Sequence, residues 1–282
     1  MSDPYLLGCA WHLVPPERPA GGPAGQRLGR RAGASLEFHE YRDYQPGDDL
    51  RHVDWRALAR TGQMHTRLYR EEIAATAEIV LDASISMRWT ERKEAGLRAL
   101  AAFFVGAAAG ENAVRAVAAA DPPHPLPSEA LRACAPAALA LEAARALPDL
   151  PLGPLLRSGA LRVVISDFLF PHPPPATARL ALGAGRALFV QLLDEAEAEP
   201  ALRGALRLRD VEGGAEREMM IDSAAAERYR ARLARLSEAL AAELQRHGGT
   251  LVRALAGRDA TGAGLAAWAR RELVPAGWLE ER

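Results

Sequence analysis

The chain has 282 residues, of which 49% are hydrophobic and 25% are charged, a composition typical of an ordinary globular protein. Lys and Arg together number 35 and Asp and Glu 36, which excludes the broad basic surplus on which nucleic-acid binding depends. The length allows one large domain, or one domain with a small addition. The two cysteines, Cys9 and Cys134, lack any metal-ligand spacing, so we expect free thiols in a reducing cytoplasm.

Targeting and membrane segments are not expected from the sequence. The first 22 residues have no basic start and no apolar core, which is not the pattern of a secretion signal. The longest apolar run, residues 99–110, is too short to span a bilayer and is typical of a buried helix. We therefore expect a soluble cytoplasmic protein without membrane insertion.

Two segments precede the regular part of the chain. Residues 1–26 are rich in Pro and Gly and have no periodicity, which predicts an irregular N-terminal arm. Residues 27–72 are polar, aromatic and dense in charge, with a turn at 45–49 and a short strand at 65–69. We expect this second segment to be a small unit of loops and β-structure that packs on the body of the protein.

From residue 73 to residue 282, apolar strand-like runs alternate with stretches of helical periodicity. Such alternation is typical of βαβ units and predicts an α/β domain, with a central, mostly parallel sheet and helices on both faces. A hairpin is expected before the longest helix, because a turn at 210–214 separates two short runs. The expected strands are 77–81, 113–120, 161–165, 187–193, 206–209, 218–221 and 250–255, and the expected helices are 91–110, 128–147, 177–182, 224–247 and 260–271.

Polar residues follow two of the predicted strands. Asp82, Ser84 and Ser86 follow the first strand in a D-x-S-x-S pattern, and Ser166 and Asp167 follow the third. Ligands of an open α/β sheet gather at the carboxyl ends of its strands, and carboxylate and hydroxyl oxygens suit a hard cation such as Mg2+. We therefore predict a metal site formed by Asp82, Ser84, Ser86 and Asp167. The alternative is that these residues only cap a helix or close a turn.

Residues 37–60, which read EFHEYRDYQPGDDLRHVDWRALAR, resemble the signature of a bacterial family known as domain of unknown function 58. In that family the signature is followed by a D-x-S-x-S motif, as it is here at residues 82–86. The stretch ISDF at 165–168, and the hairpin and long helix after it, are also similar. The resemblance therefore covers most of the chain, from Arg30 to the final helix.

The resemblance implies a von Willebrand factor A-like, Rossmann-like domain with a metal-ion-dependent adhesion site. It also implies a partnership with MoxR-type AAA+ ATPases, which act as chaperones that mature or remodel protein complexes. Related adhesion sites use a threonine from a loop before the ISDF strand, whereas the comparable stretch here, residues 146–150, has Pro148 at that position. Because proline offers no side-chain oxygen, we expect Mg2+ binding to be weak or absent.

The charged residues of the signature segment allow two interpretations. In the first, which we favour for most of them, they form ion pairs and turns that settle the segment on the body, with Trp55 and Tyr44 as buried anchors. In the second, an exposed part of the segment is the surface that a partner ATPase binds. The residues assigned to that surface are Arg42, Asp48, Asp49, Arg51, Asp54 and Trp55.

These features predict a non-enzymatic adaptor that works with a MoxR-type AAA+ ATPase and a client protein. No Ser-His-Asp, Cys-His or paired-carboxylate arrangement follows from the sequence order, so no catalytic residue is assigned. No glycine-rich phosphate loop is present, so a nucleotide is not the expected ligand. One alternative is a metal-dependent hydrolase that uses Asp82 and Asp167 as cation ligands. Another is a nucleic-acid-binding module that uses the basic N-terminal arm at Arg27, Arg30 and Arg31.

Overall fold

The computed structural model describes residues 3–15, 36–45, 51, 53–71, 76–110, 113–133, 139–201 and 203–282. The chain divides into two units. The main unit consists of Met1–Gly22 and Ala75–Arg282, and the signature unit consists of Pro23–Ala74. The first residues of the chain therefore belong to the main unit, although the signature unit separates them from the rest of it in the sequence.

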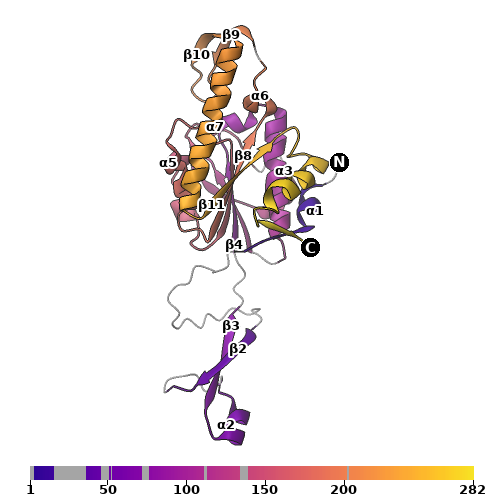
Figure 1. The fold of residues 1–282 in the computed structure, drawn as a ribbon, viewed down its shortest axis with the longest axis vertical. Helices are drawn as coiled ribbons and strands as arrows, with labels where there is room; N and C mark the ends of the chain where they lie inside the picture. The colour runs from indigo at the N-terminus through magenta and orange to yellow at the C-terminus, as the bar shows by residue number, and fades with distance from the viewer. Residues whose placement is uncertain are drawn as a thin grey trace. The chain divides into compact units, whose positions relative to one another are not determined.

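The signature unit contains a two-stranded antiparallel ribbon (Figure 1). Strand β2 (Leu36–Asp43) pairs with β3 (His65–Glu71), and the ladder is irregular between Phe38 and Glu40. A β-bulge of this kind increases the local twist of the ribbon. The strand expected at residues 65–69 is confirmed, and it extends by two residues beyond the expected end.

Between the two strands lies α2 (Trp55–Thr61), whose ends are set by local chemistry. The Asp54 carboxylate caps the start, because its Oδ1 accepts the backbone N–H groups of Arg56 and Ala57 at 3.0 and 3.1 Å. Gly62 ends the helix with a φ of 74°, in the left-handed region that glycine adopts without strain. These caps account for a seven-residue helix in a segment without strong helical periodicity.

The main unit contains a six-stranded sheet formed by β4 (Thr76–Asp82), β5 (Ala113–Ala119), β6 (His124–Leu126), β7 (Leu161–Ser166), β8 (Arg186–Leu193) and β11 (Gly249–Leu255). The strand order is β11-β8-β7-β4-β5-β6. All neighbouring pairs are parallel except β5 and β6, so the mostly parallel sheet expected from the sequence is confirmed. Strands β4, β7 and β8 are almost completely buried, as their continuous apolar runs require.

The strand order places a switch point between β4 and β7. From β4 the chain continues to β5 on one side, and it later returns to β7 on the other side of β4. Strands β4 and β7 end at the same edge of the sheet, with Leu81 opposite Ile165. In open α/β sheets, ligands bind outside the carboxyl ends of the strands, where the strand order reverses. The residues after Leu81 and Ile165 therefore lie where a binding site is expected.

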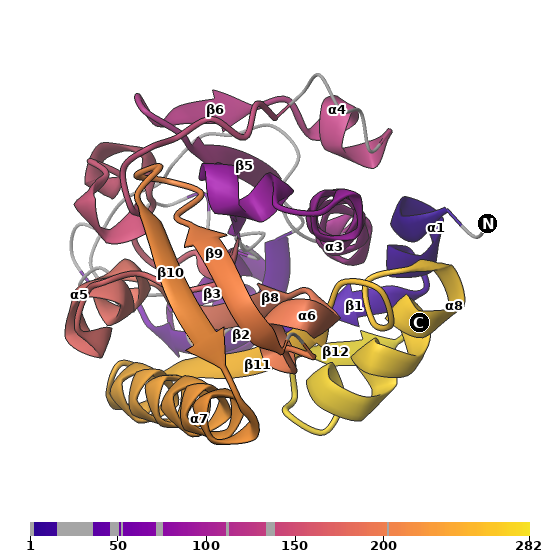
Figure 2. The same ribbon diagram turned by 90° about the horizontal axis from the view of Figure 1, so that it is seen from above.

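The helices of the main unit are α1 (Pro4–Gly8), α3 (Glu91–Ala108), α4 (Ser128–Arg132), α5 (Pro174–Ala178), α6 (Glu195–Ala198), α7 (Ser223–Arg246) and α8 (Gly262–Trp268). Helices α1, α3 and α8 lie on one side of the sheet, and α5 and α7 lie on the other (Figure 2). On the first side, Phe104 of α3 packs in one core with Ile79. On the second, Leu240 and Leu244 of α7 pack in another core with Val80. None of the helices in the described ranges is long and apolar enough to cross a membrane.

The expected hairpin is confirmed as β9 (Gly204–Arg209) and β10 (Glu216–Ile221), and β10 leads directly into α7. The hairpin lies across the end of the sheet at which the parallel strands finish (Figures 1 and 2). Most of its residues are exposed, because β9 and β10 pair with each other and not with a strand of the six-stranded sheet. Its turn is therefore placed near the switch point of the sheet.

The irregular arm expected at residues 1–26 is wrong for residues 3–15. These residues form α1 and β1 (Trp11–Leu13), and β1 pairs with β12 (Leu279–Glu281) near the C-terminus. Gly8 allows α1 to approach α3 closely, because a Cβ atom there would lie 2.1 Å from a backbone carbonyl oxygen of α3. The buried Trp11 and Leu13 join the core, a short alternation that the Pro and Gly content of the arm concealed.

The helix expected over residues 128–147 is confirmed at α4 (Ser128–Arg132) and is wrong for residues 139–147, while residues 134–138 lie outside the described residues. Residues 139–146 instead run beside the loop that follows β4. The Ala143 N–H donates to the Ala83 carbonyl at 2.9 Å, and the Ile85 N–H donates to the Ala143 carbonyl at 3.3 Å. The buried backbone of the loop needs these partners, and meeting that need outweighs the helical preference of an alanine-rich stretch.

Two other helices differ from the expected boundaries. The helix expected over 177–182 is observed as α5, followed by a 3-10 turn at Arg179–Ala181. Proline is favoured at the first helical positions, so the helix begins earlier than its apolar pattern predicted. The closing helix expected over 260–271 is observed as α8, followed by a π-helical turn at Ala269–Leu273.

Candidate binding site at the carboxyl end of the sheet

Asp82, Ser84 and Ser86 lie together where β4 ends. Asp82 is the last residue of the strand, and its Oδ1 accepts the Ser84 backbone N–H at 2.9 Å. The hydroxyl oxygens of Ser84 and Ser86 are 2.9 Å apart and share a hydrogen bond. Asp82 and Ser84 are buried, whereas Ser86 is half-buried. Ser86 is therefore the member of this loop that a ligand reaches first.

The end of β7 lies beside this loop and supplies Ser166 and Asp167. The Ser166 hydroxyl donates to Asp82 Oδ2 at 2.5 Å and accepts the Phe168 N–H at 3.0 Å. Asp167 Oδ1 accepts the Leu169 N–H at 2.9 Å. Phe168 has a φ of 55°, and such strain in a bulky residue persists only where the surroundings fix it, as they do at binding sites. The four residues predicted from the sequence therefore meet at one edge of the sheet.

The Asp82 carboxyl is held in an unusual electrostatic environment. Burial raises the pKa of Asp82 to about 6, and the negative charge of Asp167 adds to this effect. Hydrogen bonds from Ser166 and Ser84 lower the pKa, but they do not offset the burial. Asp82 therefore titrates near neutral pH, which is a property of functional sites more often than of structural carboxylates.

Lys93, in the first turn of α3, is a member of this site that the sequence reasoning missed. Its side chain is 0% exposed, and its Nζ donates to Asp167 Oδ2 at 2.8 Å and to Glu197 Oε1 at 2.7 Å. Burial lowers the pKa of the Lys93 ammonium, but the two carboxylates outweigh this and raise the pKa above its ordinary value. Glu197 is fixed in turn by the Asp194 N–H, which donates to its Oε2 at 2.8 Å. Lys93 is therefore a charged, buried and fully positioned group.

A row of polar side chains continues the site across the sheet. Ser166 lies opposite Gln191 of β8, and Gln191 lies opposite Arg253 of β11. Gln191 Nε2 donates to the Asp167 carbonyl at 3.0 Å, and Gln191 Oε1 accepts bonds from Arg253 Nε at 3.1 Å and the Ser237 hydroxyl at 3.0 Å. The row connects the strand ends to α7. Its members stand singly in otherwise apolar or helical patterns, so no sequence pattern pointed to them.

The turn of the β9–β10 hairpin brings Glu212 to the same place. Burial raises the pKa of Glu212, a hydrogen bond with Ser86 lowers it, and the charge of Asp167 raises it further. Glu212 therefore lies close enough to interact with both residues. The Asp210 carboxylate holds the turn, because it accepts the N–H groups of Glu212 and Gly213, each at 3.1 Å. The hairpin thus adds a half-buried acid beside the serine pair.

The oxygen atoms of the two aspartates are engaged within the protein and do not fit a divalent cation. The Asp82 oxygens accept bonds from Ser84 and Ser166, and the Asp167 oxygens accept bonds from Leu169 and Lys93. Within the described ranges, no group of three or more His, Cys, Asp or Glu has the arrangement of a metal site. Mg2+ requires about six oxygen ligands in near-octahedral geometry, and an ion at Asp167 would lie beside the like charge of the Lys93 ammonium, 2.8 Å from Asp167 Oδ2.

The stretch that lies beside Ser84 is not residues 146–150, where the sequence comparison placed the expected threonine position. The residue that pairs with Ser84 is Ala143, through an isolated parallel bridge, and not Pro148. Pro148 lies further along, in the 3-10 turn Leu147–Asp149. Neither residue has a side-chain oxygen, and residues 139–150 contain no Ser or Thr. The segment therefore supplies no hydroxyl ligand to the site.

The surface expected in the signature unit is only partly as predicted. Asp54 is buried, and besides capping α2 it accepts the Tyr41 hydroxyl at 2.9 Å, so its role is structural. Trp55 is 55% exposed and Tyr44 is half-buried, so neither is a buried anchor within the signature unit itself, and their packing on the main unit stays a prediction. Trp55 shares its exposure with the rest of α2, which buries none of its residues. Of the other residues expected at this surface, Arg42 is half-buried, Arg51 is exposed, and Asp48 and Asp49 lie outside the described residues.

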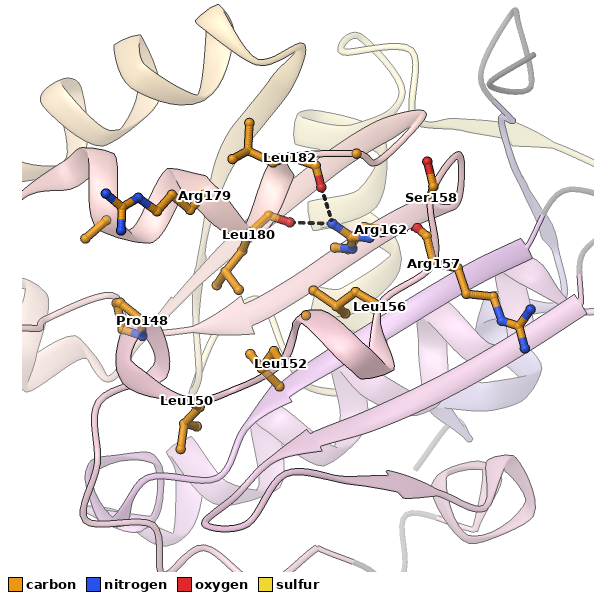
Figure 3. Close-up of a pocket in the computed structure, with 13 residues that line it drawn as sticks. Pro148, Leu150, Leu152, Leu156, Arg157, Ser158, Arg162, Arg179, Leu180 and Leu182 are labelled. Carbon is orange, nitrogen blue, oxygen red and sulfur yellow. Dashed lines mark hydrogen bonds between the residues drawn. The ribbon is translucent and has the colours of Figure 1, made fainter. Parts of the chain in front are cut away.

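A pocket of about 410 Å³ lies at the other end of the sheet, where β7 begins (Figure 3). Arg162 lines it and donates to the carbonyl oxygens of Leu180 and Leu182 at 2.6 and 3.1 Å. The remaining guanidinium N–H groups donate to Glu78 and to the Arg157 carbonyl. Arg162 therefore has no donor left for a ligand. We therefore assign Arg162 and its hydrogen bonds a structural role and do not treat this pocket as a second candidate site.

Two solved structures are similar to this chain. The conserved hypothetical protein BatB from Bacteroides thetaiotaomicron is 12% identical, with 72% of this chain and 98% of that chain covered and a TM-score of 0.37. An aerotolerance-related membrane protein from Bacteroides fragilis is 15% identical, with 71% and 99% covered and the same TM-score of 0.37. At this TM-score the likeness supports no conclusion about fold or function.

The sequence itself has clear relatives. Uncharacterized proteins from Mycobacterium bovis and from two strains of Mycobacterium tuberculosis are each 30% identical over 219 residues, which is 71% of this chain and 68% of theirs. Residues 40–239 match the family described as "Protein of unknown function DUF58". This match covers the signature from residue 40 onward, both strand ends of the candidate site and the hairpin. The chain therefore belongs to the DUF58 family.

Proposed function

We propose that the protein is a non-enzymatic, protein-binding adaptor whose main unit is a von Willebrand factor A-like domain. The observation that carries this proposal is the meeting of Asp82, Ser84, Ser86 and Asp167 at the switch point of the sheet. Side chains from two central strands converge there beside the strained Phe168, and a polar group of a partner that reaches this edge meets the Ser86 hydroxyl.

We further propose that the partners are a MoxR-type AAA+ ATPase and a client protein whose maturation it assists. This part rests on the family signature at residues 37–60, whose resemblance implies such an ATPase. The exposed Trp55 and Tyr41 support it, because large exposed aromatic side chains are typical anchors of protein interfaces. In this proposal the signature unit binds the ATPase, the strand ends bind the client, and the protein works in the cytoplasm.

A metal-dependent hydrolase is the second candidate, and the geometry favours it less. Such an enzyme needs a cation with an open position and a base that activates water. The oxygens of Asp82 and Asp167 instead accept hydrogen bonds from within the chain. A screen with p-nitrophenyl phosphate in Mg2+ and Mn2+ should show no turnover. Binding of nucleic acid through Arg27, Arg30 and Arg31 concerns residues outside the described ranges.

Affinity measurements with a purified MoxR-type ATPase from the same organism test the ATPase part of the proposal. Trp55→Ala is expected to weaken binding by roughly tenfold or more, as the loss of a central aromatic anchor does. Trp89→Ala is the matched control, since Trp89 is an exposed tryptophan of the main unit and lies outside the proposed ATPase surface. Equal binding by both variants and the wild type would show that the signature unit does not hold the ATPase.

The client site is tested by capture of proteins from the native host with tagged full-length protein. Ser86→Ala removes the accessible hydroxyl at the end of β4, whereas Ser158→Ala makes the same chemical change at the opposite end of the sheet. A specific client should be captured by the wild type and by Ser158→Ala, and be lost with Ser86→Ala. A client that both variants capture equally would contradict the assignment of the site.

A further inference from the structure

Lys93 is the single lysine of the chain. Since Lys and Arg together number 35, the other 34 of these residues are all arginine. The chain thus uses arginine for all its basic side chains of this kind except one, and the one lysine is fully buried between two acids. The ammonium is a compact point charge with three donors, whereas the guanidinium is larger and planar. The sequence therefore points to a specific need for a small cation at this place.

The acids around Lys93 exceed the charge that it carries. Lys93 contacts Asp167 and Glu197 directly, and the charge of Asp167 also reaches Asp82 and Glu212. The side chains of Asp167 and Glu197 are only 2% and 14% exposed, and Asp82 is 1% exposed, so these acids share a poorly hydrated space. A cation is needed to hold such a group together.

We propose that the Lys93 ammonium is the resident cation of this site, in place of a divalent metal ion. Its Nζ bonds Asp167 Oδ2 at 2.8 Å, the same aspartate that the sequence predicted as a metal ligand. A metal ion at Asp167 would have to displace the ammonium or lie beside a like charge. The residues present thus disagree with the Mg2+ site that the family resemblance implies, and they complete the site without a metal.

The position of Lys93 is built into the surrounding elements. Thr90 caps α3, because its Oγ1 accepts the Lys93 backbone N–H at 3.1 Å. The same hydroxyl donates to Asp194 Oδ2 at 2.7 Å, and Asp194 caps α6, the helix that carries Glu197. One chain of hydrogen bonds therefore fixes the backbone of Lys93 relative to one of the acids that it neutralises. The proposal concerns how the site is assembled, and it holds for any partner.

Thermal unfolding of the full chain in EDTA, and then in rising Mn2+ or Mg2+, tests the proposal. The wild type should have the same melting temperature in EDTA and in millimolar metal. Lys93→Met should melt lower in EDTA and shift upward by several degrees as Mn2+ rises, because Asp167 and Glu197 are then free to bind the ion. Arg162→Met is the matched control: it also removes a buried cation, but it leaves the single carboxylate of Glu78, so Mn2+ should not restore it.

Two results would overturn the proposal. One is calorimetric binding of Mg2+ or Mn2+ to the wild type at micromolar concentration. The other is a Lys93→Met variant whose melting temperature does not respond to metal. If Lys93→Met fails to fold in either condition, the double variant Lys93→Met/Asp167→Asn decides the question. Removal of the opposing charge should restore folding with no response to metal, and a double variant that stays unfolded also overturns the proposal.

Discussion

Strands β4 and β7 carry buried charge at both of their ends, and the two ends differ in how that charge is matched. Where the strands begin, Glu78 and Arg162 pair across the sheet. Where the strands end, Asp82 and Asp167 lie with Lys93. All five side chains are withdrawn from solvent, so burial does not distinguish the two clusters.

At the beginning of the strands, each charged group has a partner of opposite sign. Glu78 accepts bonds from Arg162 at 3.2 Å, from Arg115 at 3.4 Å and from the Arg157 backbone N–H at 2.7 Å. The other N–H groups of Arg162 donate to backbone carbonyl oxygens. A network satisfied in this way fixes the strands and the following loop, and it offers nothing to a ligand.

At the end of the strands, the acids outnumber the cation. Lys93 neutralises Asp167 and Glu197, while burial still raises the pKa of Asp82 and that of Glu212. Burial also lowers the pKa of Arg162 at the other end, so the excess of acids over cations, and not a shifted pKa, distinguishes the two ends. The comparison therefore separates an end at which the buried charges are matched from the end at which we propose that a client binds.

The largest expected effect on stability comes from a variant that breaks the buried pair of Glu78 and Arg162. Arg162→Ala leaves the Glu78 carboxylate buried, and removal of one partner of a buried ion pair costs about 3–5 kcal/mol. Arg115 is partly exposed and 3.4 Å away, so it compensates only a small part of this loss. The free energy of unfolding, measured by urea denaturation at neutral pH, should fall by this amount, while the folded variant should still capture its client.

A double variant is the control for this prediction. Glu78→Leu with Arg162→Met replaces the pair by apolar side chains of similar length, and such replacements of buried pairs are often close to neutral, within about 1 kcal/mol. The double variant should therefore be more stable than Arg162→Ala. A single variant as stable as the double variant would mean that the pair does not organise this end of the sheet.

The next effect depends on pH and belongs to the unmatched end. The folded-state pKa of Asp82 is about 6, above the ordinary value of 3.8, so in this range the folded protein holds a proton that the unfolded chain releases. The contribution of Asp82 to stability is therefore complete below about pH 4 and is lost as the pH rises to about 6. Asp82→Asn removes this loss, and at neutral pH the variant should be more stable by up to about 3 kcal/mol.

The difference between Asp82→Asn and the wild type isolates this carboxyl from the other acids. Melting temperatures measured over a pH series should differ least at the acidic end and diverge as the pH rises to about 6. Above that pH the difference should stay constant. The same difference at every pH would mean that Asp82 titrates in the ordinary acidic range, and the contrast between the two ends of β4 would then lose its electrostatic basis.

The sheet and the strand ends could be predicted from the sequence, because each buried parallel strand is a continuous apolar run. The runs at 77–81, 161–165 and 187–193 all became strands at the centre of the sheet. The change from apolar to polar residues marks the edge of the sheet, so Asp82 and Asp167 were placed correctly at strand ends.

What the sequence could not show is which distant residues meet. Lys93 reaches Asp167 and Glu197 across 74 and 104 residues, and helical periodicity counts Lys93 only as a polar residue of a first turn. Ala143 lies in an alanine-rich stretch that favours a helix, yet it runs beside Ser84. In both cases the contacts are made by tertiary structure, and the local secondary-structure preference of the residue does not indicate its partner.

A smaller effect on stability tests how far the candidate site extends from the strand ends toward α7. Ser237 of α7 donates to Gln191 Oε1 at 3.0 Å, so Ser237→Ala removes one link in the polar row behind Asp167. The loss of one such hydrogen bond should lower the free energy of unfolding by about 1 kcal/mol. Unchanged client capture, measured beside Ser86→Ala, would show that the row only supports the site. Weakened capture would extend the site to α7.

The smallest effect on stability concerns Glu212, and it separates binding from folding most cleanly. Burial raises the pKa of Glu212, so Glu212→Gln should leave the free energy of unfolding within about 0.5 kcal/mol of the wild type or raise it slightly. Glu216→Gln on the same hairpin is the matched control, since Glu216 is exposed and faces Arg207 at 3.9 Å. If the hairpin turn takes part in client binding beside Ser86, Glu212→Gln should change capture and Glu216→Gln should not. Equal capture by both would confine the unmatched end to the strand ends themselves and leave the hairpin outside the site.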